Sequence, residues 1–464
     1  MKQKIPMLFL SAGIICLVCG MLFGVLSGIQ YLLPAFIKES IPFSNLRPMH
    51  VTAVISWIIL TATGGIYFYI RNERPVSALL SGLHLAIFLV TGVLIFFSYA
   101  TNRFGGKEYL EFPPYLIVPI VAGWLLFGIH YFRAMAAGFR TWPVYNYMWA
   151  TGIIMMVYHL GEACLWLNPE IGGNFIKSLT VQWKAGGSFV GAWNMLVYGT
   201  AIFLMSKIGP SSASGHSRIA FFFYFLGLTN LMFGWAHHVY IVPTVSWVRV
   251  LSYAISMTEW IILFHMIYQW RKSVRHEFDP KYAMTLKFLT ATDFWIFLNL
   301  ILALLFSIPA INYFTHGTHI TVAHSMGTTI GINTTILLAS VFYIAAQIRP
   351  GFSLRKFRLG FRIFNVSLFF FFLSLIAAGV QKSIWQYGTQ SGTFSQMQDS
   401  LRWTYMSFVL WGIGIMIGIS MLAIPLLYAF LKFASAPAKS DVRPMRPVPA
   451  AVIKRIPVNS EQQD

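Results

Sequence analysis

Residues 312–333 read NYFTHGTHITVAHSMGTTIGIN and bring three histidines and a methionine to the start of a long apolar stretch. His324 and Met326 are two residues apart, so on a helix their side chains point about 200° apart. Imidazole and thioether groups are both ligands of haem iron, and ligands on opposite faces of one helix can serve two haems. The spacing therefore favours a helix between two haems, with ordinary packing as the alternative for Met326.

The rest of the chain has the composition of a membrane protein. Of its 464 residues 57% are hydrophobic, 17% aromatic and only 10% charged, which excludes a soluble enzyme with one anchor. Apolar runs of about 20 residues are long enough to cross a bilayer as helices. They predict an all-α, polytopic protein with about twelve transmembrane helices. The predicted spans are 7–33, 48–70, 79–99, 114–132, 145–166, 185–206, 219–239, 245–269, 288–311, 320–346, 363–381 and 403–431.

The basic residues predict the orientation of these spans. Twelve spans put both termini on one side, and 24 of the 33 lysines and arginines fall on that side. The positive-inside rule then places both termini in the cytoplasm. The formal charge of +19 therefore reflects basic residues in the cytoplasmic loops and tail beside the lipid surface. Nucleic acid is not expected as a partner. We expect a membrane domain over 1–434 and a basic, proline-rich, disordered cytoplasmic tail over 435–464.

Histidines are unusually frequent inside the predicted spans. An imidazole in hydrocarbon is costly without a partner, so each requires either metal or haem ligation or an interhelical hydrogen bond. We interpret His84, His130 and His265 as structural, and His159 with Glu162, one helical turn apart, as a local hydrogen-bonded pair. The eight histidines in or beside spans are His50, His84, His130, His159, His237, His238, His265 and His324.

Two further histidine motifs suggest ligation. His50 lies at the start of the second span beside Arg47, an arrangement suited to an axial haem ligand with a cation near the propionates. His237 and His238 are adjacent, so on a regular helix they point about 100° apart. They can converge on one metal only near a helix end or irregularity, and Pro243 supplies an end nearby. Two hydrogen-bonded histidines at a helix end are the structural alternative.

Together these segments resemble the large subunit of bacterial nitric oxide reductase, a twelve-helix member of the haem-copper oxidase superfamily. The resemblance covers most of the chain, and the order of the segments agrees with the family. The matching stretches are LRPMH (46–50), GGKEYLEFP (105–113), GWAHHVYIVPTVSWV (234–248), SYAISMTEW (252–260), NYFTHGTHITVAH (312–324) and AAGVQKS (377–383).

The resemblance implies a haem-copper oxidase subunit I fold in a bacterial inner membrane and a reaction on a diatomic gas, nitric oxide or oxygen. It implies that His50 ligates a low-spin haem b and that His324 ligates a high-spin haem. It also implies that His237 and His238 bind a non-haem iron or copper. The electrons would come from a membrane-anchored cytochrome c-type subunit.

Three carboxylates match acidic residues of the family. Glu108 and Glu111 correspond to residues near the haem propionates, the first implicated in binding a structural calcium together with the cytochrome c subunit. Glu259 corresponds to a glutamate near the catalytic pocket. Carboxylates suit both roles, as oxygen ligands for Ca²⁺ and as proton carriers or metal ligands in a buried site.

The sequence departs from the family pattern at the metal site. The stretch QWKAGGSFVGAWN (182–194) has Gly186 or Gly187 where the family carries a third metal-binding histidine. If Gly191 and Trp193 anchor the alignment, Val190 and Asn194 replace two glutamates. Met326 also replaces the family's second histidine on the low-spin haem, which predicts His50/Met326 ligation and a raised haem potential.

Two imidazoles alone make a poor site for iron or copper, so we expect this site to be metal-poor unless Glu259, His319 or a water completes it. Three functions remain open. The chain is an active reductase or oxidase with an altered metal site, a two-haem electron-transfer or gas-binding protein without non-haem metal, or a transporter-like protein that keeps only the scaffold.

Overall fold

The chain folds into a bundle of long helices. The computed structural model describes residues 4–73, 77–209, 215–240, 242–243, 245–255, 257, 265, 267–268, 279–348, 354–388 and 392–436. Within these residues the one β-type pairing is an isolated bridge between Lys107 and Leu110. The major helices are α1 (Lys4–Leu32), α2 (Phe43–Tyr69), α3 (Ala78–Ala100), α4 (Ile117–Met135), α5 (Val144–Glu162), α7 (Phe175–Ile208), α8 (Arg218–Phe233), α10 (Ala283–Ser307), α12 (His319–Met326), α13 (Thr335–Ile348), α14 (Leu354–Tyr387) and α16 (Arg402–Ser435).

Eleven helical segments of the described chain are long and apolar enough to cross a membrane. They confirm the predicted all-α, polytopic membrane fold. The eighth predicted span, 245–269, is described only in part, and Glu259 within it lies outside the described residues. The predicted tail also lies outside them from residue 437 onward.

Some span boundaries differ from the prediction. The predicted span 288–311 is α10, which ends at Ser307 because Pro309 begins the separate short helix α11 (Pro309–Thr315). A proline cannot donate the backbone hydrogen bond that would continue the preceding helix. The helix α7 starts at Phe175, ten residues before the predicted boundary at 185, with the side chain of Asn174 accepting a hydrogen bond from the Lys177 amide as its N-cap.

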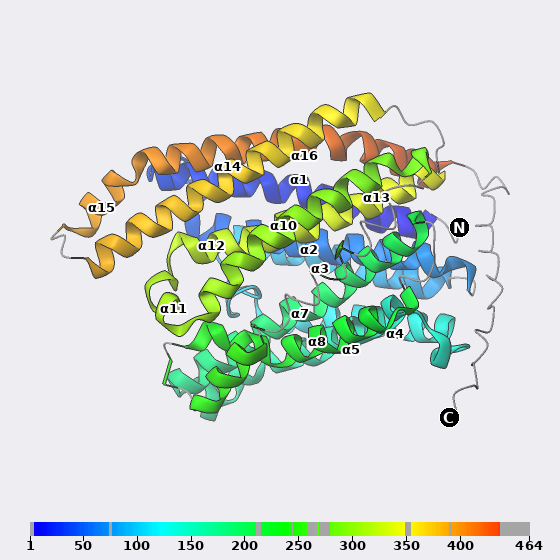
Figure 1. Cartoon of the computed structure of the whole chain (residues 1–464), viewed down its shortest axis with the longest axis horizontal. Helices are drawn as coiled ribbons and strands as arrows, with labels where there is room; N and C mark the ends of the chain where they lie inside the picture. Colours follow the sequence, from blue (N-terminus) through cyan, green and yellow to red (C-terminus); the bar gives the residue numbers. More distant parts are fainter. Residues whose placement is uncertain are drawn as a thin grey trace, which may run out of the picture.

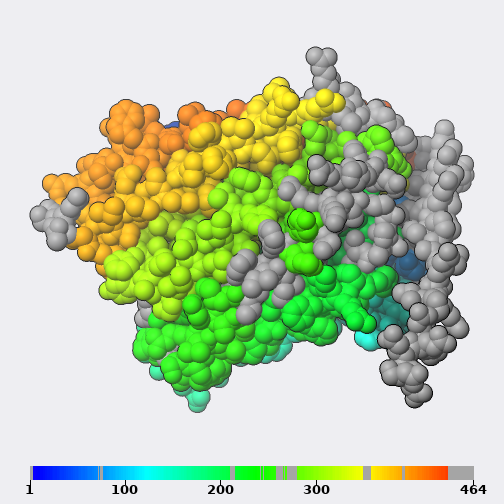
Figure 2. Space-filling view, viewed as in Figure 1, coloured from blue at the N-terminus to red at the C-terminus, as the bar shows by residue number. Residues whose placement is uncertain are grey.

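The helices run nearly parallel to one another along the bundle (Figure 1). The first helix, α1, begins at the same end of the bundle where α16 finishes, while α11 and α15 (Phe394–Ser400) lie at the opposite end (Figure 1). In the space-filling view, the yellow and orange segments that include α14 lie along one side and the green segments that include α8 along the other (Figure 2). The most extensive helix contacts join α1 to α2, α14 to α16, α1 to α16 and α5 to α7.

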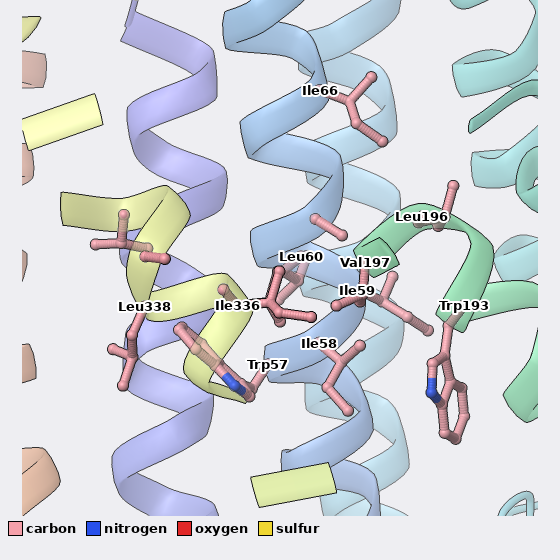
Figure 3. Packing of buried hydrophobic residues seen from close by; sticks show 14 of the residues in the cluster. Trp57, Ile58, Ile59, Leu60, Ile66, Trp193, Leu196, Val197, Ile336 and Leu338 are labelled. Atoms are coloured by element: carbon pink, nitrogen blue, oxygen red, sulfur yellow. The ribbon is translucent and has the colours of Figure 1, made fainter. Parts of the chain in front are cut away.

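The core is built from large apolar side chains on helices that are far apart in the sequence. Trp57 on α2, Trp193 on α7 and Ile336 on α13 are all buried. In Figure 3, Trp57 and Ile336 lie on the side of α2 that faces α13, and Trp193 lies on the side that faces α7. The indole of Trp57 also donates a hydrogen bond to the Thr334 hydroxyl at 3.1 Å, which satisfies its buried N–H.

A π-helix, η8 (Gly327–Thr334), directly follows α12. Such wide turns are rare and occur frequently at functional sites. Hydrogen bonds to side chains of other helices hold the segment: Asn299 donates to the Thr328 hydroxyl at 2.7 Å, and Asn333 donates to the side-chain Oδ1 of Asn194 at 2.9 Å. The irregular segment therefore lies immediately after His324 and Met326 and is fixed to α7 and α10.

Candidate functional site

His50 is supported by α1. The His50 Nδ1 and the Gly20 carbonyl oxygen form a hydrogen bond of 2.7 Å. Because a carbonyl can only accept, Nδ1 is the donor, and Nε2 keeps the lone pair. Gly24 on α1 makes room for the ring, since a Cβ at that position would lie 2.8 Å from the imidazole Cε1 and Nδ1. A hydrogen bond on one ring nitrogen that frees the other is the usual support of a metal-ligating histidine.

Arg47, one turn before His50, joins the two loop carboxylates. Its Nη2 contacts Glu108 Oε1 at 2.6 Å and its Nη1 contacts Glu111 Oε1 at 2.9 Å. The side chains are 41% exposed for Arg47, 32% for Glu108 and 13% for Glu111, so each pair contributes only about 0–1 kcal/mol. The contacts therefore serve mainly to position the loop against α2.

Glu111 has a second, unpaired oxygen. Its Oε2 is buried and has no hydrogen-bond partner in the described part of the molecule. Burial raises the pKa of Glu111 above its ordinary value, while the nearby Arg47 guanidinium acts in the opposite direction. A buried carboxylate oxygen without a partner is a suitable ligand for a hard cation.

The adjacent histidines lie on the 3₁₀ helix η6 (Gly234–Val239), which directly follows α8. The pair thus lies at an irregularity, where adjacent imidazoles can approach one another, and the two ring centroids are only 4.2 Å apart. Asn312 donates to the His237 carbonyl at 3.1 Å and so ties η6 to α11. The His237 Nδ1 is buried without a hydrogen-bond partner among the described residues.

Trp183 on α7 covers His238. The indole and the imidazole are stacked with an interplanar angle of 5° and ring centroids 4.9 Å apart. The same indole meets the His316 ring edge-on at 6.3 Å. The sequence interpretation did not identify Trp183, because a tryptophan inside an apolar span carries no signal that distinguishes it from packing.

His316, in the turn between α11 and α12, belongs to this group of rings. His319 does not belong to it, because its ring packs against Tyr31 on α1 and Tyr405 on α16, with centroids 5.8 and 5.6 Å away. Of the histidines in the 312–333 motif, His316 therefore contacts the same indole that stacks on His238.

His324 and Met326 both lie in α12, which is regular up to Met326. The His324 ring meets Phe306 edge-on at 5.6 Å, and its Nδ1 is buried with no partner in the described chain. Met326 is partly buried and packs against the main hydrophobic core. The helical geometry that directs the two side chains to different faces is thus present.

The two glycines of α7 face different neighbours. A Cβ at Gly186 would lie 3.5 Å from the Tyr109 ring, which is ordinary contact distance. A Cβ at Gly187 would lie 2.6 Å from the Trp235 Cβ, which leaves no room for a side chain. In the described ranges no group of three or more His, Cys, Asp or Glu side chains could hold a metal ion.

Other predicted histidine roles are structural. The His159 Nδ1 lies 2.8 Å from Glu162 Oε2, which confirms the predicted pair, and Lys184 forms an ion pair with the other oxygen of Glu162. His84 hydrogen-bonds through Nδ1 to the Tyr67 hydroxyl at 3.1 Å, as expected for an interhelical contact.

The fold and these residues define a haem-copper oxidase-type membrane protein, and comparison with known proteins agrees. The model of the family described as Cytochrome C and Quinol oxidase polypeptide I matches residues 4–413. The chain therefore belongs to this family, and it is a multi-pass membrane oxidoreductase of the respiratory type.

One curated relative and one solved structure give the scale of the similarity. A nitric oxide reductase subunit from Stutzerimonas stutzeri is 23% identical over 421 residues, which is 83% of this chain and 85% of that protein. A heme-copper terminal oxidase dimer solved by cryo-EM shares the fold with a TM-score of 0.75 at 14% identity. The match covers 95% of this chain and 85% of that one.

The family implies haems and a metal site. The described residues suit the haems but not the non-haem metal. For haem the fit is good, because His50 has its Nδ1 bonded and its Nε2 free, and His324 has a buried nitrogen without a partner in the described chain. For a non-haem metal the described residues do not fit, because two adjacent imidazoles have no third donor and Trp183 lies flat on one of them.

Proposed function

We propose that this chain is the haem-carrying subunit of a membrane reductase that transforms nitric oxide or oxygen with electrons from a membrane-anchored cytochrome c-type partner. The observation that carries the proposal is the His50 arrangement, in which α1 offers a carbonyl to Nδ1 and a glycine to make room for the ring. The hydrogen bond at Nδ1 orients the ring and leaves Nε2 as the nitrogen that can ligate iron.

The ligands follow from α2 and α12. His50 and Met326 would hold a low-spin haem b, and His324 would hold a high-spin haem. This division is possible because His324 and Met326 point to different faces of α12. These haems, when bound, supply electron transfer and a site for the diatomic gas. The residues of the chain set ligand identity and ring orientation.

The outer loop would dock the partner. Glu108 and Glu111 are held beside α2 by Arg47, and the unpaired Glu111 Oε2 can accept Ca²⁺. The same Arg47 would neutralise propionate charge. With both termini in the cytoplasm of a bacterial inner membrane, this loop lies on the opposite side, where a membrane-anchored cytochrome c domain would meet it.

Glu259 and the His237–His238 pair would contribute to the gas-reducing site if the chain is a catalytic reductase. Glu259 would carry protons or donate an oxygen to a non-haem iron or copper beside the pair. This role rests on the sequence, because Glu259 lies outside the described residues.

A second function is favoured by a specific observation. The stacked Trp183 and the lack of a three-donor group in the described chain favour a two-haem electron-transfer or gas-binding protein that has lost the non-haem metal. The two functions share the haem ligands and differ in the third metal.

Counting metals in the purified full chain tests both functions. A pyridine haemochrome spectrum combined with analysis for iron, copper and calcium should give two haems per chain. A further iron or copper atom would select the reductase, and two haems alone would select the electron-transfer or gas-binding protein. A chain without haem would contradict both.

A further inference from the structure

The indole of Trp183 is stacked on His238, one of the two adjacent histidines. We propose that Trp183 fills the volume from which a third donor would complete the pair, and that His316 becomes this donor when the indole is removed. This inference rests on the proposed function in one respect: it takes His237 and His238 as the counterparts of the family's metal ligands.

The first step concerns α7. The lost donor was expected at Gly186 or Gly187, but the former faces Tyr109 and the latter abuts Trp235. The α7 side chain that reaches the pair is Trp183, whose ring lies parallel to His238 at 4.9 Å. The chain therefore has an aromatic side chain, and not an empty space, on the α7 side of the pair.

The second step concerns the donors that remain. His316 touches the edge of the same indole, so Trp183 contacts both His238 and His316. The His237 ring lies beside that of His238, and its Nδ1 is buried and unpartnered in the described chain, where no three ligating side chains form a metal-binding group.

The third step concerns how each histidine is held. The pair is fixed by η6 and by the Asn312 hydrogen bond to the His237 carbonyl. His316 lies in a short turn that precedes Gly317, whose φ is +71°, so its backbone belongs to a connection and not to a long helix. Loss of the indole would free volume into which this turn, rather than η6, can move.

The test compares metal binding in the detergent-solubilised, haem-loaded full chain and in Trp183→Ala. Co²⁺ is the probe, because its visible absorption reports tetrahedral nitrogen ligation, and iron in excess of haem is measured in parallel. We expect Trp183→Ala to bind Co²⁺ about tenfold or more tightly than the unaltered chain, the scale of one gained ligand contact. Adding His316→Ala to that variant should remove the gain.

Matched variants separate the outcomes. Trp183→Phe keeps an aromatic ring in place and should stay as metal-poor as the unaltered chain, and Gly186→His, which faces Tyr109, should gain no Co²⁺ site. The proposal is overturned if the unaltered chain already binds a full equivalent of Co²⁺ beside its haems. It is equally overturned if Trp183→Ala, with normal haem content, gains nothing, or if the gain survives His316→Ala.

The haem count keeps this result separate from the proposed function. If the unaltered chain carries no haem, the proposed function fails, whatever the cobalt titration shows. If haem is present and only the cobalt result is negative, the proposed function stands and the role of Trp183 is wrong.

Discussion

The His50 region and the His237–His238 region differ in how their histidines are supported. His50 has a backbone acceptor for one ring nitrogen, a glycine that makes room for the ring, and an arginine one turn away that is braced by two carboxylates. The adjacent pair has a buried nitrogen without a partner in the described chain and an indole stacked on one ring.

This contrast separates the two parts of the family's chemistry. Ligation by His50 needs one free nitrogen in a fixed ring, and the contacts of α1 provide both conditions. A non-haem metal needs several donors that converge, and aromatic packing of about 0.5–1.5 kcal/mol beyond burial replaces that convergence here. The described residues therefore suit an axial haem ligand better than they suit a non-haem metal.

The largest expected effect comes from removing the better-supported ligand. His50→Ala should lower the haem content from two per chain to one, because the low-spin haem loses an axial ligand. The pyridine haemochrome assay measures this content. His84→Gln, which can keep a hydrogen bond to Tyr67, is the matched control and should retain both haems; equal haem loss in both variants would contradict a ligand role for His50.

The second prediction tests the partner ligand of the same haem. Met326→His should lower the reduction potential of the low-spin haem while leaving the haem bound, because a thioether ligand favours the reduced state more than an imidazole does. A spectroelectrochemical titration gives the potential, and near-infrared magnetic circular dichroism identifies the ligands. Bis-imidazole ligation in the unaltered chain would rule out His50/Met326.

The third prediction tests the support and not the ligand. Gly24→Ala places a Cβ 2.8 Å from the His50 ring, so the imidazole must shift and the low-spin haem spectrum should change with partial loss of occupancy. Gly92→Ala on α3, where a Cβ meets nothing within 4 Å, is the control. Identical spectra for the two variants would show that α1 does not position His50.

The smallest effect is expected at the outer loop. Glu111→Gln should reduce calcium content and partner association more than Glu108→Gln, because the Glu111 Oε2 is buried and, in the described chain, unpaired while Glu108 is more exposed. Calcium analysis of the purified complex measures the difference. Unchanged calcium in both variants would remove the cation assignment and leave the loop carboxylates as partners of Arg47 alone.

Much of the architecture could be predicted because hydrocarbon imposes a simple constraint. A helix that crosses a bilayer must be apolar over about 20 residues, so the apolar runs along the chain were sufficient to locate the spans. The sequence could also predict that His237 and His238 converge only near a helix end or irregularity, since adjacent residues on a regular helix point about 100° apart. The position of His319 could not, because its spacing from His324 does not show that its ring packs on Tyr31 and Tyr405.

The sequence by itself determined the membrane class, the helical spans and the histidines that could act as ligands, because length, hydropathy and side-chain chemistry are local properties. Tertiary structure alone decided that Gly20 and Gly24 support His50, that Arg47 joins Glu108 to Glu111, and that Trp183 covers His238. These contacts join residues about 26 to 64 positions apart. Their geometry depends on how helices rotate against one another, which no single helix specifies.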